Sequence, residues 1–320
     1  MEFGKSRKLR VLFLSVGLVF ALLLFQTLAS FILKLVANYA ESGSEIAVQG
    51  LPFVKFLVNL GPLSLVIYLG LVWFGIGLRD IFSGPRLPGK LVLGLILVFS
   101  SWIFLSSLIA SIVIHFFPVS DTFQTVMAEI ILNQPWYVSL FYVGFFASVS
   151  EELLCRGIMA REMRNEGTAR WAIFWSSFLF SFMHLNPWQG VPSFFTGVLL
   201  GWMYMKTGSI WVPMLGHFVN NATVLALVRL GAVSTGMVSP ETTEALPAGA
   251  TGWSYFIMLL VMGPLFLWGL DMVNRATATM PEPRWKSQAQ YIQEILSQES
   301  EDPEQTDTSQ SGEYGFPIIP

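Results

Sequence analysis

The stretch WYVSLFYVGFFASVSEELLCRG (residues 136–157) decides the class of fold to which this chain belongs. It opens with fifteen residues that carry no charge and then places Glu151, Glu152 and Arg156 within six residues. The apolar character continues to about residue 160, so the segment is long enough to cross a bilayer as a helix. Charges inside such a helix are costly and mark functional sites. The stretch therefore predicts a membrane helix that carries chemistry.

The composition of the whole chain agrees with a membrane protein. Of its 320 residues, 53% are hydrophobic and only 12% are charged, whereas soluble domains average about 25% charged residues. We expect an all-α, polytopic membrane helix bundle with about eight transmembrane helices. The eight apolar runs that predict these helices are 11–37, 57–78, 91–117, 136–160, 169–187, 191–206, 210–230 and 252–274.

The distribution of Lys and Arg between the loops predicts the orientation. Fifteen of the eighteen basic residues fall on one side of the predicted bundle, and only Lys34, Lys55 and Arg229 fall on the other. Short cytoplasmic loops are enriched in basic residues, so we expect both termini to be cytoplasmic in a multi-pass protein of the cell (plasma or inner) membrane. The basic residues assigned to the cytoplasmic side are Lys5, Arg7, Lys8, Arg10, Arg79, Arg86, Lys90, Arg156, Arg161, Arg164, Arg170, Lys206, Arg275, Arg284 and Lys286.

The chain divides into a transmembrane domain (1–276) and an acidic tail (277–320) that we expect to be mostly disordered and cytoplasmic. Two amphipathic segments, 121–134 and 285–298, are expected to lie at the membrane surface. There is no basic patch of the kind that binds nucleic acid. The single cysteine, Cys155, excludes an internal disulfide.

The spacing of the three charges in residues 136–157 predicts two different roles for them. Residues four apart stack on one face of a helix, so Glu152 pairs with Arg156, while Glu151 points elsewhere and lacks a partner on its own helix. A carboxylate in a medium of low dielectric is suited to act as a general base. The plain alternative is that all three charges form a solvated helix end at the cytoplasmic surface.

Two later segments supply further polar groups. FSFMH (180–184) places Phe180 one turn before His184 in the fifth predicted helix, and HFVNN (217–221) places His217 and Asn221 on one helix face. Alone, the first would indicate an interfacial histidine and the second a contact between helices. The fourth and fifth helices, however, form a hairpin that turns near Gly167, and Glu151 and His184 lie about 24–26 Å from that turn. We expect Glu151, His184, His217 and Asn221 to form one cluster that is reached from the cytoplasm.

Two kinds of chemistry fit this cluster. Glu151 and one histidine can hold and deprotonate a water, while the other histidine and the Asn221 amide donate to an oxyanion. Alternatively, Glu151, His184 and His217 make the three-ligand set of a catalytic zinc with an open position for water. Either arrangement hydrolyses an acyl bond such as a peptide.

EELLCR (151–156), FSFMH (180–184) and HFVNN (217–221) resemble the three motifs of the CPBP intramembrane proteases, which include type II CAAX prenyl endopeptidases and bacteriocin-processing, Abi-like proteins. The resemblance covers a motif core of about 136–225. It implies that Glu151, His184, His217 and Asn221 are catalytic and that Glu152 and Arg156 support them. It leaves the choice between a metalloprotease and a metal-free glutamate protease open. Cys155 departs from the aromatic residue that many members carry at this position.

The function expected from these observations is that of an intramembrane endopeptidase. Its partners would be the lipid bilayer and a membrane-associated protein substrate, CAAX-like or other, with no nucleic acid. One alternative is a non-catalytic immunity or scaffold protein with the same fold. A second alternative is a proton-coupled transporter that uses the acid and the histidines as a relay.

Overall fold

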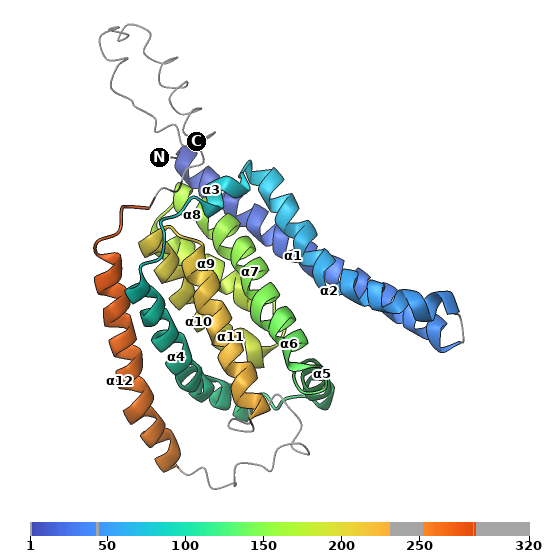
Figure 1. Cartoon of the computed structure of the whole chain (residues 1–320). Helices are drawn as coiled ribbons and strands as arrows, with labels where there is room; N and C mark the ends of the chain where they lie inside the picture. Colours follow the sequence, from blue (N-terminus) through green and yellow to red (C-terminus); the bar gives the residue numbers. More distant parts are fainter. Residues whose placement is uncertain (1, 43–44, 231–251, 284, 286–320) are drawn as a thin grey trace, which may run out of the picture. The chain divides into compact units, whose positions relative to one another are not determined.

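The computed structural model describes residues 2–42, 45–230, 252–283 and 285. Within these ranges the regular structure is entirely helical, which confirms the all-α membrane bundle (Figure 1). Each of the eight apolar runs coincides with a helix. The helices are α1 (Glu2–Glu41), α2 (Glu45–Phe74), α4 (Gly89–Phe116), the composite helix 136–166, α9 (Ala169–Phe182), α10 (Pro187–Thr207), α11 (Trp211–Arg229) and α12 (Gly252–Thr277), with the short α3 (Leu78–Phe82) and α5 (Asp121–Ile131) between them.

Four helical segments among the described residues are long and apolar enough to cross a membrane. They are Arg7–Glu41, Gly89–Phe116, Trp136–Glu166 and Trp211–Arg229, and Leu60–Phe74 is a shorter apolar helix. The acidic tail lies outside the described residues from 286 onward, and so does the amphipathic segment 285–298 apart from Trp285. The ring of Trp285 packs edge-on against Tyr204 with 5.2 Å between the centroids.

The composite helix 136–166, here called the motif helix, contains two π-helical stretches. It runs through α6 (Trp136–Ser139), η1 (Leu140–Phe146), α7 (Ala147–Glu152), η2 (Leu153–Ala160) and α8 (Arg161–Glu166). The N–H of Ala147 bonds to the carbonyl of Tyr142, and the N–H of Arg161 bonds to that of Arg156, so both bonds reach back five residues. Glu151 and Glu152 therefore lie in a short α-helical segment between two π-helical ones. Such stretches are frequent at functional sites.

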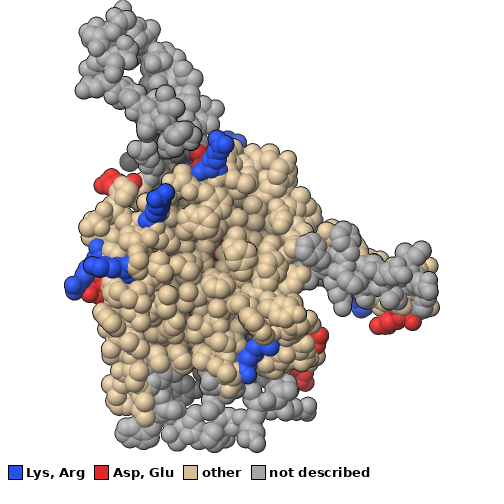
Figure 2. All heavy atoms as spheres, viewed as in Figure 1, with Lys and Arg blue, Asp and Glu red and all other residues tan. Residues whose placement is uncertain are grey.

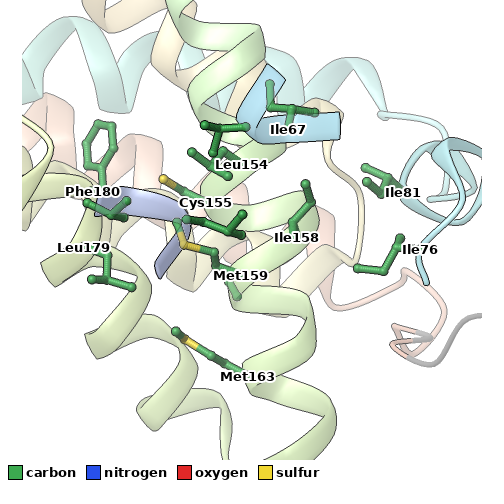
Figure 3. Packing of buried hydrophobic residues seen from close by; sticks show 14 of the residues in the cluster. Ile67, Ile76, Ile81, Leu154, Cys155, Ile158, Met159, Met163, Leu179 and Phe180 are labelled. Carbon is green, nitrogen blue, oxygen red and sulfur yellow. The ribbon is translucent and has the colours of Figure 1, made fainter. Parts of the chain in front are cut away.

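Apolar packing buries the motif helix on its C-terminal half. Cys155 is fully buried there, as expected for a small apolar side chain. Figure 3 shows side chains of the motif helix packed against others from α2, α3 and α9. These residues are Leu154, Ile158, Met159 and Met163 on the motif helix and Ile67, Ile81, Leu179 and Phe180 on the other three.

A second core joins α4 to α10, α11 and α12. It comprises Leu91, Leu95, Val98, Phe99, Leu200, Met203, Val212 and Val273. α11 comes very close to α4 at Gly216, where an added Cβ would lie 2.3 Å from a ring carbon of Phe99. Gly216 is therefore required by this close approach, immediately before His217.

The hairpin turn between the motif helix and α9 lies where the sequence predicts it. α8 ends at Glu166, and the hydroxyl of Thr168 caps α9 by accepting the N–H of Trp171 at 3.3 Å. The prediction for the other end of α9 is wrong, because the helix stops at Phe182 and not near residue 187. Asn186 instead caps α10, with Pro187 in its first turn, and Leu185 has a φ of +53°. A residue before proline disfavours the helical conformation, so the chain turns here.

Because of this early turn, α9 is a short helix. Its 14 residues span about 21 Å, whereas the hydrocarbon core of a bilayer is about 30 Å thick. His184 accordingly lies in the α9–α10 turn and not within the fifth helix. A cavity lies beside this turn, toward the end of the bundle remote from Gly167, and it contains the candidate site.

Candidate active site

One cavity of about 1090 Å³ brings the predicted cluster together. Glu151, His184, His217 and Asn221 all line it, although they come from the motif helix, the α9–α10 turn and α11. Met127 and Ile130 of α5 also line it. The segment 121–134, which we expect at the membrane surface, is thus helical over Asp121–Ile131 and forms part of the cavity wall.

Glu151 is the carboxylate that faces the cavity. Its side chain is 24% exposed, and its Oε2 lies 3.9 Å from Nε2 of His217. At this separation the two atoms are not directly hydrogen-bonded, but both are within reach of one water between them.

Glu152 and Arg156 form the ion pair that their spacing predicts. Nη1 of Arg156 lies 2.7 Å from Oε1 of Glu152, and both side chains are fully buried. Nη2 of Arg156 donates to the carbonyl of Gly197 at 2.7 Å, and the guanidinium lies over the ring of Phe180. An added Cβ at Gly197 would be 3.2 Å from this guanidinium. The ion pair therefore ties the motif helix to α9 and α10.

Glu152 has a second partner that the sequence analysis did not predict. Its Oε1 accepts a hydrogen bond from Nδ1 of His217 at 2.9 Å. This contact determines which face of the imidazole is turned to the cavity, because Nδ1 is occupied and Nε2 is left to point toward Glu151. Glu152 is thus the residue that orients His217.

The imidazole of His184 is oriented by a backbone carbonyl four residues earlier in the chain. Its Nδ1 lies 3.0 Å from the carbonyl oxygen of Phe180, and since a carbonyl can only accept, Nδ1 carries the proton. Nε2 then faces the cavity, with the hydroxyl of Ser193 at 3.5 Å. The ring of Phe180 stands between the two histidines, edge-on to both, with centroid distances of 5.3 Å to His184 and 5.6 Å to His217.

Asn221 is held by two polar contacts. Its Nδ2 donates to the carbonyl of Val143 in η1 at 2.8 Å, and its Oδ1 accepts from Nδ2 of Asn220 at 3.2 Å. An amide NH₂ has two N–H groups, so one donor remains beyond the bond to Val143. Asn220 also lines the cavity. The sequence analysis missed this residue, although the doubled asparagine of HFVNN was a visible signal.

The zinc alternative requires three ligands around one point. No group of three His, Cys, Asp or Glu side chains is arranged to hold a metal ion within the ranges 2–42, 45–230 and 252–283. Glu151, His184 and His217 present one carboxylate and two imidazole Nε2 atoms to the same cavity.

Comparisons with known proteins point to one family. The family model described as Type II CAAX prenyl endopeptidase Rce1-like matches residues 133–223. No curated protein and no solved structure matches the chain. The matched region contains the motif helix, both histidines and Asn221, and it agrees with the resemblance drawn from the three motifs. Residues 133–223 of this integral membrane protein are therefore similar to the Rce1-like type II CAAX prenyl endopeptidases.

Proposed function

We propose that this protein is an intramembrane endopeptidase that hydrolyses a peptide bond of a membrane-associated protein with a water activated by Glu151. The proposal rests on the different surroundings of two adjacent carboxylates, Glu151 and Glu152. Glu152 is fully buried and is bound to Arg156 and His217, whereas Glu151 is partly exposed in the cavity, 3.9 Å from Nε2 of His217.

The first chemical step is addition of water to the scissile carbonyl. Glu151 takes a proton from the water, whose remaining hydroxide attacks the carbonyl carbon. Nε2 of His217, 3.9 Å from the Glu151 carboxylate, accepts the second hydrogen of the water and fixes its position. The C=O bond becomes a single bond, and the negative charge moves to its oxygen.

The developing oxyanion needs donors that are already in place. The unused N–H of Asn221 is one such donor. In the second step the C–N bond breaks, the oxyanion re-forms a carbonyl, and the proton held by Glu151 moves to the leaving nitrogen. One water is consumed, and a carboxylic acid and an amine are produced.

The substrate class follows from the lining of the cavity. Most lining residues are apolar or aromatic, and α5 and the second half of α4 form part of the wall. An apolar peptide segment that is already anchored in the bilayer fits such a wall. A CAAX-like, lipid-modified segment belongs to this class, as the Rce1-like match favours.

The proposal is tested by incubating the purified wild-type protein, in bilayers, with a library of membrane-anchored peptides and mapping the products by mass spectrometry. We expect cleavage at internal peptide bonds, and loss of this cleavage when His184 and His217 are both replaced by Ala. No cleaved peptide, together with a cellular phenotype that survives the double replacement, would support a non-catalytic scaffold instead.

A further inference from the structure

The residues that line the cavity gather toward one end of the bundle, and the part of the cavity at that end is here called its mouth. Its wall is built from Ile103–Ile114 of α4, from α5, from the first half of the motif helix, from the α9–α10 turn and from His217–Leu225 of α11, with further residues from α1 and α2. Most of the lining residues of α4, the motif helix and α11 lie toward the ends remote from the hairpin turn at Gly167. Among the described lining residues, none belongs to α3 or α8, which lie at the end that carries this turn.

The short α9 explains why the cavity is at this end. α4 has 28 residues and α9 has 14, so α9 is about 21 Å shorter than α4. The chain turns back at His184 and Asn186 before α9 reaches the far end of the bundle. Trp188 and Gln189, just after the turn, form part of the cavity wall.

Side-chain contacts join the helices that surround the cavity at the same end. The indole N–H of Trp188 donates to the carbonyl of Phe117, and its ring packs against Phe123 of α5 with centroids 5.2 Å apart. Arg229, at the end of α11, donates to the carbonyl of Gln134 and to the hydroxyl of Ser139. These contacts hold α5 and the segment after it against α10 and α11 at this end of the cavity.

The basic residues gather at the opposite end. Figure 2 shows most of the Lys and Arg side chains of this face toward the end that carries α3 and α8. By their places in the helices, Arg79 lies on α3, Arg164 on α8 and Arg170 at the start of α9, whereas Arg229 lies at the end of α11. Short basic loops are retained in the cytoplasm, so the Gly167 turn marks the cytoplasmic end and the mouth lies at the other.

We propose that the cavity admits its substrate from the non-cytoplasmic side of the membrane, so that the peptide that is cut is the externally facing segment of a membrane-anchored protein. The statement that the peptide is cut rests on the proposed function. The side from which the substrate enters is inferred independently of that function. This inference replaces the expectation of a site reached from the cytoplasm, because the cavity and the basic loops lie at opposite ends of the helices.

The side of access is tested by labelling single cysteines in the full chain in intact cells. Ser111→Cys lies at the mouth, and Ser107→Cys lies one helical turn farther into the same wall. Ser83→Cys, at the end of α3, is the matched control on the other side, because Ser83 is exposed and undergoes the same substitution. The native Cys155 is buried, so the wild-type chain gives the background.

With a membrane-impermeant maleimide added outside the cells, we expect labelling of Ser111→Cys and Ser107→Cys. Ser83→Cys should react only after the cells are permeabilised. Labelling of Ser83→Cys from outside, or of Ser111→Cys and Ser107→Cys only after permeabilisation, would overturn the proposal. Because the labelling requires no catalysis, its outcome is independent of whether the chain cleaves peptides.

Discussion

Glu152 and His217 are 65 residues apart in the sequence and are joined by a hydrogen bond of 2.9 Å between Oε1 and Nδ1 in the interior of the bundle. The same carboxylate oxygen accepts a hydrogen bond from Arg156 at 2.7 Å. A buried carboxylate with two such partners is committed to structure. We therefore propose that its neighbour Glu151 is the acid that acts in catalysis.

Breaking the buried ion pair is expected to destabilise the fold strongly. Arg156→Met leaves Glu152 buried without its cation, so we expect the free energy of unfolding to fall by about 3–5 kcal/mol. Unfolding by denaturant in detergent micelles measures this loss.

The chain offers a matched control for that experiment. Asp271 and Arg275 have the same four-residue spacing, with a distance of 2.9 Å, but their side chains are largely exposed. Arg275→Met should change the free energy of unfolding by no more than about 0.5 kcal/mol. Equal effects of the two substitutions would contradict a special role for the buried pair.

Phe180 is expected to position both histidines. Its ring is edge-on to His184 and His217 and lies 5.0 Å from the Arg156 guanidinium. Phe180→Leu keeps an apolar side chain but removes the ring that contacts both histidines, so we expect kcat for peptide cleavage to fall by about 10-fold or more.

Phe178→Leu is the corresponding control on the same helix, since Phe178 is 45% exposed and lies outside the cavity wall. It should retain the wild-type kcat. If both variants lost activity to the same extent, the effect would come from α9 as a whole and not from the contacts of Phe180.

The close approach of α11 to α4 predicts a packing defect at Gly216. An added methyl would lie 2.3 Å from the buried ring of Phe99, so Gly216→Ala should cost about 1–3 kcal/mol of stability through overpacking. Adding Phe99→Leu should recover part of this loss. Unfolding midpoints of the single and double variants measure both effects.

Gly61→Ala provides the comparison, because no atom lies within 4 Å of its added Cβ. In a helix interior this change should leave stability unchanged or raise it by about 0.5–1 kcal/mol. A similar loss at both glycines would show that the contact with Phe99 is not the cause.

The sequence predicts those features of the fold that depend on local patterns. Each of the eight apolar runs predicts a helix that the structure contains, and the four-residue spacing identifies the Glu152–Arg156 pair. The polar turn at Gly167 fixes the hairpin, which puts Glu151 and His184 in the lining of one cavity.

Other features depend on how the helices are rotated and where they end. The Glu152–His217 bond joins two helices, and no spacing within either one determines which side chain meets the imidazole. The two π-helical stretches also have no signature in the apolar pattern. The early end of α9 was readable in part, since Asn186 and Pro187 form a helix-start signal inside an apolar run.

The central claim is that Glu151 supplies the base for hydrolysis, and its most direct test is the rate of peptide cleavage by Glu151→Gln. The amide preserves the size of the side chain but cannot take a proton, so we expect the rate to fall by about 10²–10⁴-fold with an unchanged unfolding midpoint. Glu41→Gln, the same substitution at an exposed position of α1, should cleave at the wild-type rate. A Glu151→Gln protein that cleaves as fast as the wild type would contradict the account.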